Sequence, residues 1–168
     1  QTDSVARTFV HFYTTHQNLA TAVMHAVPNL PSWAIGLSTA KDTIHMMAPK
    51  HPDYEYNYML VVLIHEFAHC VTLNIKSNFG NNPRWLWESV ALYEAGQFIH
   101  PNMLPYMVNQ TPPTLAQLNN FSNTQIYEVG FLLAEYIVLN WDRQHLKDMI
   151  LNLGNTLQVL GMNTTQFQ

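Results

Sequence analysis

The sequence predicts an α+β fold, mostly helical, in which a small N-terminal sheet precedes a central helix and a helical C-terminal half. Three observations support this prediction. Two short β-like pieces, residues 33–37 and 43–48, flank a turn-like segment. The apolar segment 60–71 has the length and composition of a buried helix, with apolar residues around most of its circumference. Beyond it, most segments carry helix start and stop signals.

Length and composition fit one globular domain. The chain has 168 residues, of which 48% are hydrophobic and 12% aromatic, enough to bury a core. We expect a single domain over residues 1–168, with an upper part (1–72) that holds the sheet and the central helix, and a helical lower part (73–168). The sequence begins with Gln1, and we expect a mature or trimmed fragment whose targeting segment lies outside it.

Charge and polarity exclude some classes of partner. Only 11% of the residues are charged and the net charge is -4, which excludes a basic nucleic-acid-binding surface. The longest apolar run, residues 58–64, is too short to cross a bilayer and predicts no membrane span. Polarity comes mainly from Asn, Gln, Thr and Ser, which favours a secreted or cell-envelope location over the cytoplasm. The oligomeric state stays open.

The N-terminal segment, residues 2–27, is expected to be one amphipathic helix. It begins with the capping residues Thr2, Asp3 and Ser4 and carries apolar residues at spacings of three and four. Pro28 is expected to end this helix.

The central helix carries the most informative motif, His65-Glu66-x-x-His69. Residues four apart lie on one face of a helix, where two imidazoles can bind one metal ion. Glu66 lies close enough to that face to reach a water held by the metal. Chance also produces this motif, so a helix with two incidental histidines is the alternative. For Cys70, a small buried core residue is favoured over a fourth ligand or a redox-sensitive neighbour.

A third metal ligand is expected from the next helix. The polar segment 74–83 breaks the first helix, Pro83 suits the first turn of a new one, and Gly96 lies near its end. Two antiparallel helices packed side by side would place Glu88 opposite His65 and His69. Eighteen residues separate His69 from Glu88.

The C-terminal half predicts an irregular connection followed by several helices. Residues 100–120 contain four prolines and one short turn at 114–118. Ser122 and Gln125 predict a capping box at the start of a helix that runs to about Trp141, with Phe121 against Ile126 as a hydrophobic staple. Further helices are expected at residues 142–153, at 156–160 and from Asn163 onward.

In these motifs the sequence resembles the gluzincin zinc metallopeptidases, the group that includes aminopeptidase N and leukotriene hydrolase. The resemblance rests on HExxH, eighteen intervening residues and Glu88 within a Trp-x-x-Glu-x-x-Ala-x-Tyr segment, residues 85–93. A third match is Tyr127-Glu128-x-Gly130-Phe131, similar to the family's Tyr-Glu-x-Gly-Phe helix. The three motifs occur in the family's order and cover roughly residues 33–168.

The resemblance implies a thermolysin-like zincin domain with one Zn²⁺ per chain, held by His65, His69 and Glu88. Glu66 would act as the general base toward a zinc-held water, and Tyr127 would donate to the developing oxyanion. It also implies that the piece at 43–48 is a sheet edge beside the cleft, with a core strand as the alternative. Glu94 would either orient a ligating histidine or be a solvated carboxylate at the helix end.

The expected activity is hydrolysis of peptide bonds in peptide or protein substrates. Exopeptidases of the family carry a Gly-x-Met-Glu-Asn segment before HExxH, whose Glu grips the substrate's free amine. Residues 43–48 contain no acid, which favours an endopeptidase. Ser89 replaces the usual Gly, without harm to zinc binding. The alternatives are an aminopeptidase, another zinc hydrolase, or a non-catalytic binding module of the same fold.

Overall fold

The computed structural model describes residues 7–49 and 54–167 and has an α+β fold, mostly helical, with a small N-terminal sheet. The chain divides into two compact units, Gln1–Asn74 and Ile75–Gln168, and each is described by itself. The fold class predicted from the sequence is therefore confirmed at the level of an α+β, mostly helical chain.

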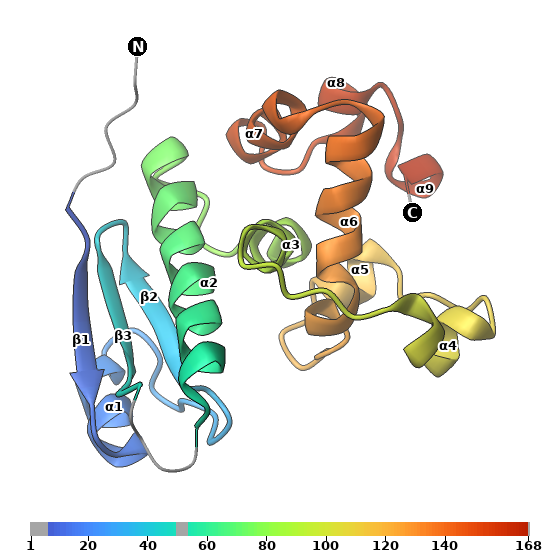
Figure 1. The fold of residues 1–168 in the computed structure, drawn as a ribbon. Helices are drawn as coiled ribbons and strands as arrows, with labels where there is room; N and C mark the ends of the chain where they lie inside the picture. Colours follow the sequence, from blue (N-terminus) through green and yellow to red (C-terminus); the bar gives the residue numbers. More distant parts are fainter. Residues whose placement is uncertain (1–6, 50–53, 168) are drawn as a thin grey trace. The chain divides into compact units, whose positions relative to one another are not determined.

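The first unit consists of a three-stranded sheet and two helices (Figure 1). Along the chain these are β1 (Phe9–Tyr13), α1 (His16–Val23), β2 (Gly36–Ala40), β3 (Thr43–Met47) and α2 (Tyr56–Ile75). The strand order is β1-β3-β2, with β3 parallel to β1 and antiparallel to β2. Buried side chains of α1, α2 and β3 form its core, among them Leu19, Val23, Met46, Met59 and Val62.

The predicted N-terminal helix over residues 2–27 is wrong for much of its length. Phe9–Tyr13 forms a strand, and the helix covers only His16–Val23. The sequence FVHFY consists largely of aromatic and β-branched residues, which suit a strand when a partner such as β3 is present. The helix starts where the Thr15 hydroxyl accepts a hydrogen bond from the Asn18 amide. The capping residues expected at positions 2–4 lie outside the described residues.

The placement of the second β-like piece as a sheet edge is also wrong. β3 lies between β1 and β2 and is the central strand, so the alternative of a core strand is correct. The edge strand beside it is β2, which starts at Gly36, three residues later than the first β-like piece in the sequence. Ile44 and Met46 of β3 are fully buried, as expected for a central strand.

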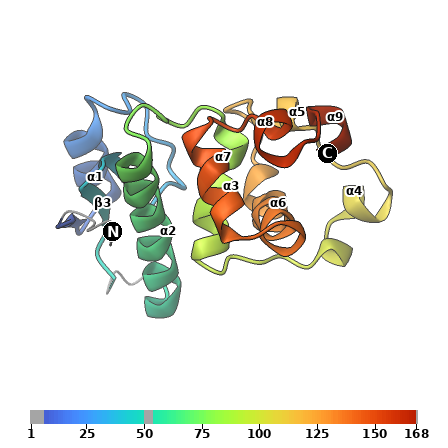
Figure 2. The ribbon, with the colours of Figure 1, turned by 90° about the horizontal axis from the view of Figure 1, so that it is seen from above.

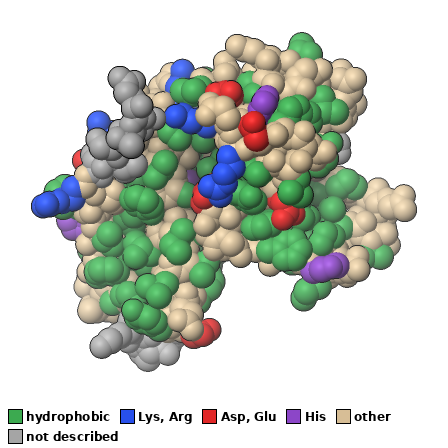
Figure 3. Space-filling view, turned by 45° about the horizontal axis from the view of Figure 1, so that its top comes forward, with side chains coloured by type: hydrophobic (Ala, Val, Ile, Leu, Met, Phe, Trp, Pro, Cys, Tyr) green, Lys and Arg blue, Asp and Glu red, His purple; other side chains and the backbone are tan. Residues whose placement is uncertain are grey.

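One face of α2 is exposed, contrary to the prediction of a helix buried on all sides. Leu60, Ile64 and Phe67 recur at helical spacing and are 37%, 47% and 40% exposed. In Figure 3 hydrophobic side chains gather on the surface of the part of the molecule that contains this helix. A three-stranded sheet and one short helix provide too little surface to enclose a 20-residue helix.

By length and composition alone, α2 is apolar enough to cross a membrane. The core helix of a soluble protein meets the same criterion, and α2 carries His65, Glu66 and His69 in buried positions. The absence of a membrane span therefore stays a prediction.

Every regular element among the described residues of the second unit is a helix (Figures 1 and 2). Its elements are α3 (Arg84–Glu94), η1 (Pro101–Met103), α4 (Pro105–Val108), α5 (Leu115–Leu118), α6 (Ile126–Asn140), α7 (Arg143–Leu151), α8 (Thr156–Leu160) and α9 (Thr164–Phe167). α3 crosses α6 and lies beside it in both views, and this is the most extensive helix contact of the unit. Gly130 permits this approach, because a Cβ there would lie 2.6 Å from Cδ1 of Leu92.

Helix signals that depend on neighbouring residues are confirmed in most of this unit. The turn expected at 114–118 is α5, where Thr114 and Gln117 form a capping box. The helix at 156–160 is α8, and Asn163 and Gln166 cap α9 reciprocally. The segment 100–120 is not wholly irregular, since Pro101 and Pro105 each occupy the first turn of a short helix.

The capping box expected at Ser122 and Gln125 is wrong. α6 begins at Ile126, and the Ser122 hydroxyl instead donates to the Asn120 side chain. The Asn123 side chain accepts a hydrogen bond from the Gln125 amide just before the helix. Phe121 is 76% exposed, so it does not form a staple with the fully buried Ile126.

Candidate functional site

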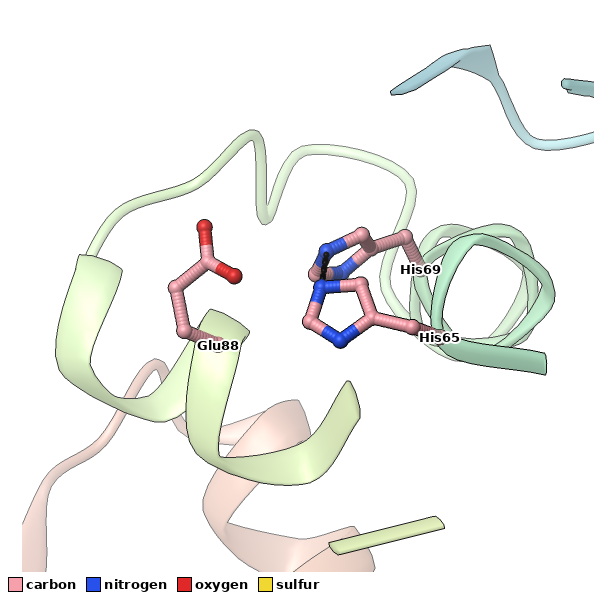
Figure 4. A group of neighbouring side chains, drawn as sticks. All are labelled: His65, His69 and Glu88. Carbon is pink, nitrogen blue, oxygen red and sulfur yellow. Dashed lines mark hydrogen bonds between the residues drawn. The ribbon is translucent and has the colours of Figure 1, made fainter. Parts of the chain in front are cut away.

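The candidate site starts from two imidazole rings that project from one side of α2 (Figure 4). Nε2 of His65 lies 3.1 Å from Nε2 of His69, and the two rings meet edge to face. Both residues are buried, with 8% and 4% of their surface exposed. The four-residue spacing in a helix produces this approach directly, as the sequence predicts.

The separation of the two Nε2 atoms fits ligation of one metal ion. Zinc-bound imidazole nitrogens lie about 2.0–2.1 Å from the metal, so two of them in a tetrahedral shell are about 3.3 Å apart. The observed 3.1 Å is close to that value. Without a metal, the same contact requires one ring to donate a proton to the other.

The protonation state of His69 also favours a metal. Burial, and then the neighbouring His65 ring, hold the pKa of His69 well below its usual range. A neutral imidazole keeps the lone pair that a metal needs, whereas a protonated ring cannot ligate. Folding therefore keeps His69 in the form that binds metal.

Glu66 is buried beside the edge strand β2 and is 7% exposed. The Ser38 hydroxyl donates a hydrogen bond of 3.2 Å to its Oε2. β2 approaches this closely because Gly36 has no side chain, and a Cβ there would lie 3.1 Å from Val62 and 3.3 Å from Cγ of Glu66. Sequence reasoning did not identify Ser38, which lies 28 residues from Glu66.

Glu88 and Tyr127 are brought together within the second unit. Glu88 projects from α3 and is 5% exposed (Figure 4). The Tyr127 hydroxyl, from α6, donates to Oε1 of Glu88 over 3.5 Å. The sequence predicts that Tyr127 lies off the apolar stripe of its helix, and its hydroxyl indeed points to Glu88.

Arg84 is a buried residue of this region that sequence reasoning missed. It is 4% exposed, and its Nη1 donates to the carbonyls of Leu118, Asn120 and Asn123 at 2.9–3.1 Å. Its guanidinium also lies over the rings of Phe121 and Tyr127, at 5.5 and 5.4 Å from the ring centres. No short-range signal marks this role, because all these partners lie more than 30 residues away.

Glu94 belongs to a surface ion pair. Its carboxylate lies 3.3 Å from the Arg143 guanidinium, and both side chains are substantially exposed. Of the two alternatives open in the sequence, the solvated carboxylate at the helix end is correct. Glu128, which follows Tyr127, accepts a hydrogen bond of 2.6 Å from Tyr106. Burial and this contact raise the pKa of Tyr106.

A second histidine pair lies on the sheet. His11 and His45 are register partners on β1 and β3, and their rings stack 5.0 Å apart. The Tyr13 hydroxyl lies 2.7 Å from Nδ1 of His45. Among the residues that the structure describes, no third His, Cys, Asp or Glu completes a metal-binding group with this pair.

Cys70 is buried, as predicted, and its thiol donates to the Ala40 carbonyl. Burial, and then the Glu66 charge, raise the pKa of the thiol to about 11. At pH 8 almost no thiolate forms, so we expect a thiol reagent such as DTNB to label Cys70 only after denaturation. Labelling of the native protein within minutes at pH 8 would contradict this prediction.

Comparison with models of known protein families, with curated proteins and with solved structures gives no match. The resemblance to gluzincins therefore stays a prediction from the three sequence motifs.

Proposed function

We propose that this chain is a zinc-dependent peptidase with a thermolysin-like catalytic domain. The observation that carries the proposal is the pair of buried imidazoles on α2, whose Nε2 atoms lie 3.1 Å apart. Surface histidines that meet by chance are solvated, whereas these two are buried, and burial holds the pKa of His69 well below its usual range. A metal ion is the partner that satisfies both lone pairs at once.

In this proposal Glu88 is the third ligand. Two histidines alone bind zinc weakly, and a catalytic zinc usually has three protein ligands and one open position. His65, His69 and Glu88 are each buried, and two imidazoles with one carboxylate are a ligand set that suits a catalytic zinc. The His-His-Glu set with eighteen intervening residues is also the gluzincin pattern. The proposal includes an arrangement of the two units in which the Glu88 carboxylate meets the two imidazoles.

When bound, zinc lowers the pKa of a coordinated water to about 7 and polarises the scissile carbonyl. Glu66 takes a proton from the attacking water and transfers it to the nitrogen of the scissile bond, so the amine leaves as a neutral group. The Ser38 hydroxyl orients the Glu66 carboxylate through its hydrogen bond to Oε2. Tyr127 donates a hydrogen bond from its hydroxyl to the carbonyl oxygen as negative charge develops there.

An endopeptidase is favoured over an aminopeptidase. An aminopeptidase needs an acid near the metal helix that binds the substrate's free amine. The edge strand β2 has the sequence GLSTA and β3 has TIHMM, so neither offers a carboxylate. A substrate bound there is not anchored by its N-terminus and can extend in both directions.

The proposed function is tested by mass spectrometry of new peptide termini. A denatured protein mixture is incubated with the zinc-loaded chain, and in parallel with its Glu66→Gln variant. We expect internal cleavage sites that are absent with the variant. Removal of single N-terminal residues would favour an aminopeptidase, and a folded, zinc-loaded sample that cuts nothing would contradict the peptidase proposal.

Replacement of Tyr127 by Phe should lower kcat by about a hundredfold, because it removes one oxyanion donor. KM and zinc content should change little, since Tyr127 is not a ligand. Tyr136→Phe is a matched control, because Tyr136 lies on the same helix and is 42% exposed. A Tyr127→Phe variant as active as Tyr136→Phe would remove Tyr127 from the mechanism.

A further inference from the structure

We propose that Arg84 is a positioning residue that fixes the ring of Tyr127 for its role as hydrogen-bond donor to the oxyanion. This inference rests on the proposed function, because it assigns Arg84 a role only through Tyr127. The contacts that carry it all lie within the second unit.

Arg84 and Glu88 hold Tyr127 at two points. They lie four residues apart on α3 and therefore on one face, one turn from each other. The guanidinium lies over the Tyr127 ring, 5.4 Å from its centre, and Glu88 accepts the bond from the hydroxyl at the end of the same ring. Tyr127 thus spans one turn of α3, with its ring against a cation and its hydroxyl against a carboxylate.

Arg84 also fixes the backbone from which Tyr127 emerges. The carbonyls of Leu118, Asn120 and Asn123 all accept hydrogen bonds from Nη1 of Arg84. These bonds hold together the connection that leads from α5 into α6. Tyr127 is the second residue of α6, four positions after the last of these carbonyls. A change in this connection therefore moves the start of α6 and the ring of Tyr127 with it.

Lysine cannot replace Arg84 in this arrangement. The guanidinium is planar, so it can lie over the Phe121 and Tyr127 rings while its N–H groups bond in its own plane. A lysine ammonium keeps the charge but provides no flat surface and directs its donors differently. Arg84→Lys is therefore a conservative variant that removes the geometry and keeps the charge.

The test is a double-mutant cycle with Arg84→Lys and Tyr127→Phe, with kcat and KM measured on a peptide cleaved by the wild type. We expect Arg84→Lys to lower kcat at least tenfold with KM nearly unchanged, since small displacements of a catalytic group are costly. The loss should nearly vanish in the Tyr127→Phe background. An equal loss in both backgrounds means a general structural role and overturns the inference.

Two further measurements keep the inference testable if Arg84→Lys folds poorly or the peptidase proposal fails. Phe121→Ala removes the exposed ring that lies 5.5 Å from the guanidinium, and Leu139→Ala, at the same 76% exposure, is its control. We expect only Phe121→Ala to lower kcat, by a few fold and only when Tyr127 is present.

The second measurement is independent of activity. In protein with ring-labelled tyrosine, the NMR signal of Tyr127 should shift in Phe121→Ala and stay unchanged in Leu139→Ala. An unchanged signal in Phe121→Ala overturns the inference. A wild type with no peptidase activity contradicts the proposed function, whereas the labelled signal still decides whether the Arg84 cluster holds Tyr127.

Discussion

Replacement of Glu66 by Gln is expected to lower kcat by about a thousandfold, with the zinc content of the protein unchanged. Gln has nearly the same shape as Glu and can still accept the Ser38 hydrogen bond, but it cannot take a proton from water. A positioned general base contributes about 10²–10⁴ to the rate, and here the same group also serves the leaving amine. The measurement is steady-state cleavage of a defined peptide, with zinc content determined on the same samples.

The control is Glu55→Gln, a change of the same kind in the same unit at an exposed residue near the start of α2. It should leave kcat within about twofold of the wild-type value, since substitutions of exposed residues away from special structural features have small effects. A Glu66→Gln variant that kept a tenth or more of the activity would exclude Glu66 as the proton acceptor.

Replacement of His69 by Ala is expected to abolish the stabilisation of the protein by zinc. A ligand that binds only the folded state at a hundred times its Kd raises the free energy of unfolding by about 2.7 kcal/mol. Loss of a supporting partner of a ligand already lowers metal affinity about 10–100-fold, and loss of the ligand itself must lower it further. The measurement is the midpoint of thermal unfolding with and without zinc, after removal of bound metal.

His25→Ala is the matched control, because His25 is an exposed histidine of the same unit outside the candidate site. Its zinc-dependent rise in midpoint should equal that of the wild type. If zinc stabilised the wild type and His69→Ala equally, the metal would bind elsewhere and the assignment of His69 would be wrong.

Features that depend on residues close in sequence are predictable here. α5, α8 and the cap of α9 form where the sequence places them, because their capping side chains lie within three or four residues of the groups they bind. The approach of His65 and His69 has the same origin, since helix periodicity alone brings their rings together. The contact between Tyr127 and Glu88 goes beyond such rules, because the two residues lie 39 positions apart in the sequence.

Features that depend on distant partners were missed or misjudged. Phe9–Tyr13 has apolar spacings compatible with a helix and becomes a strand because β3, more than 30 residues later, supplies the partner backbone. The exposed face of α2 depends on how little surface the small sheet offers. Arg84 looks like an ordinary charge at a helix start, and only the fold brings three carbonyls and two rings around it.

The central claim is that His65, His69 and Glu88 hold one zinc ion, and zinc-edge X-ray absorption with metal analysis tests it most directly. We expect one zinc per chain, with two imidazole nitrogens at about 2.0–2.1 Å from the metal and oxygen in the remaining positions of its shell. In Glu88→Gln, zinc affinity should fall while the two imidazoles remain in the shell of any zinc still bound. Less than a tenth of a zinc per chain under saturating conditions, or a shell without two imidazoles, would contradict this assignment of the zinc ligands.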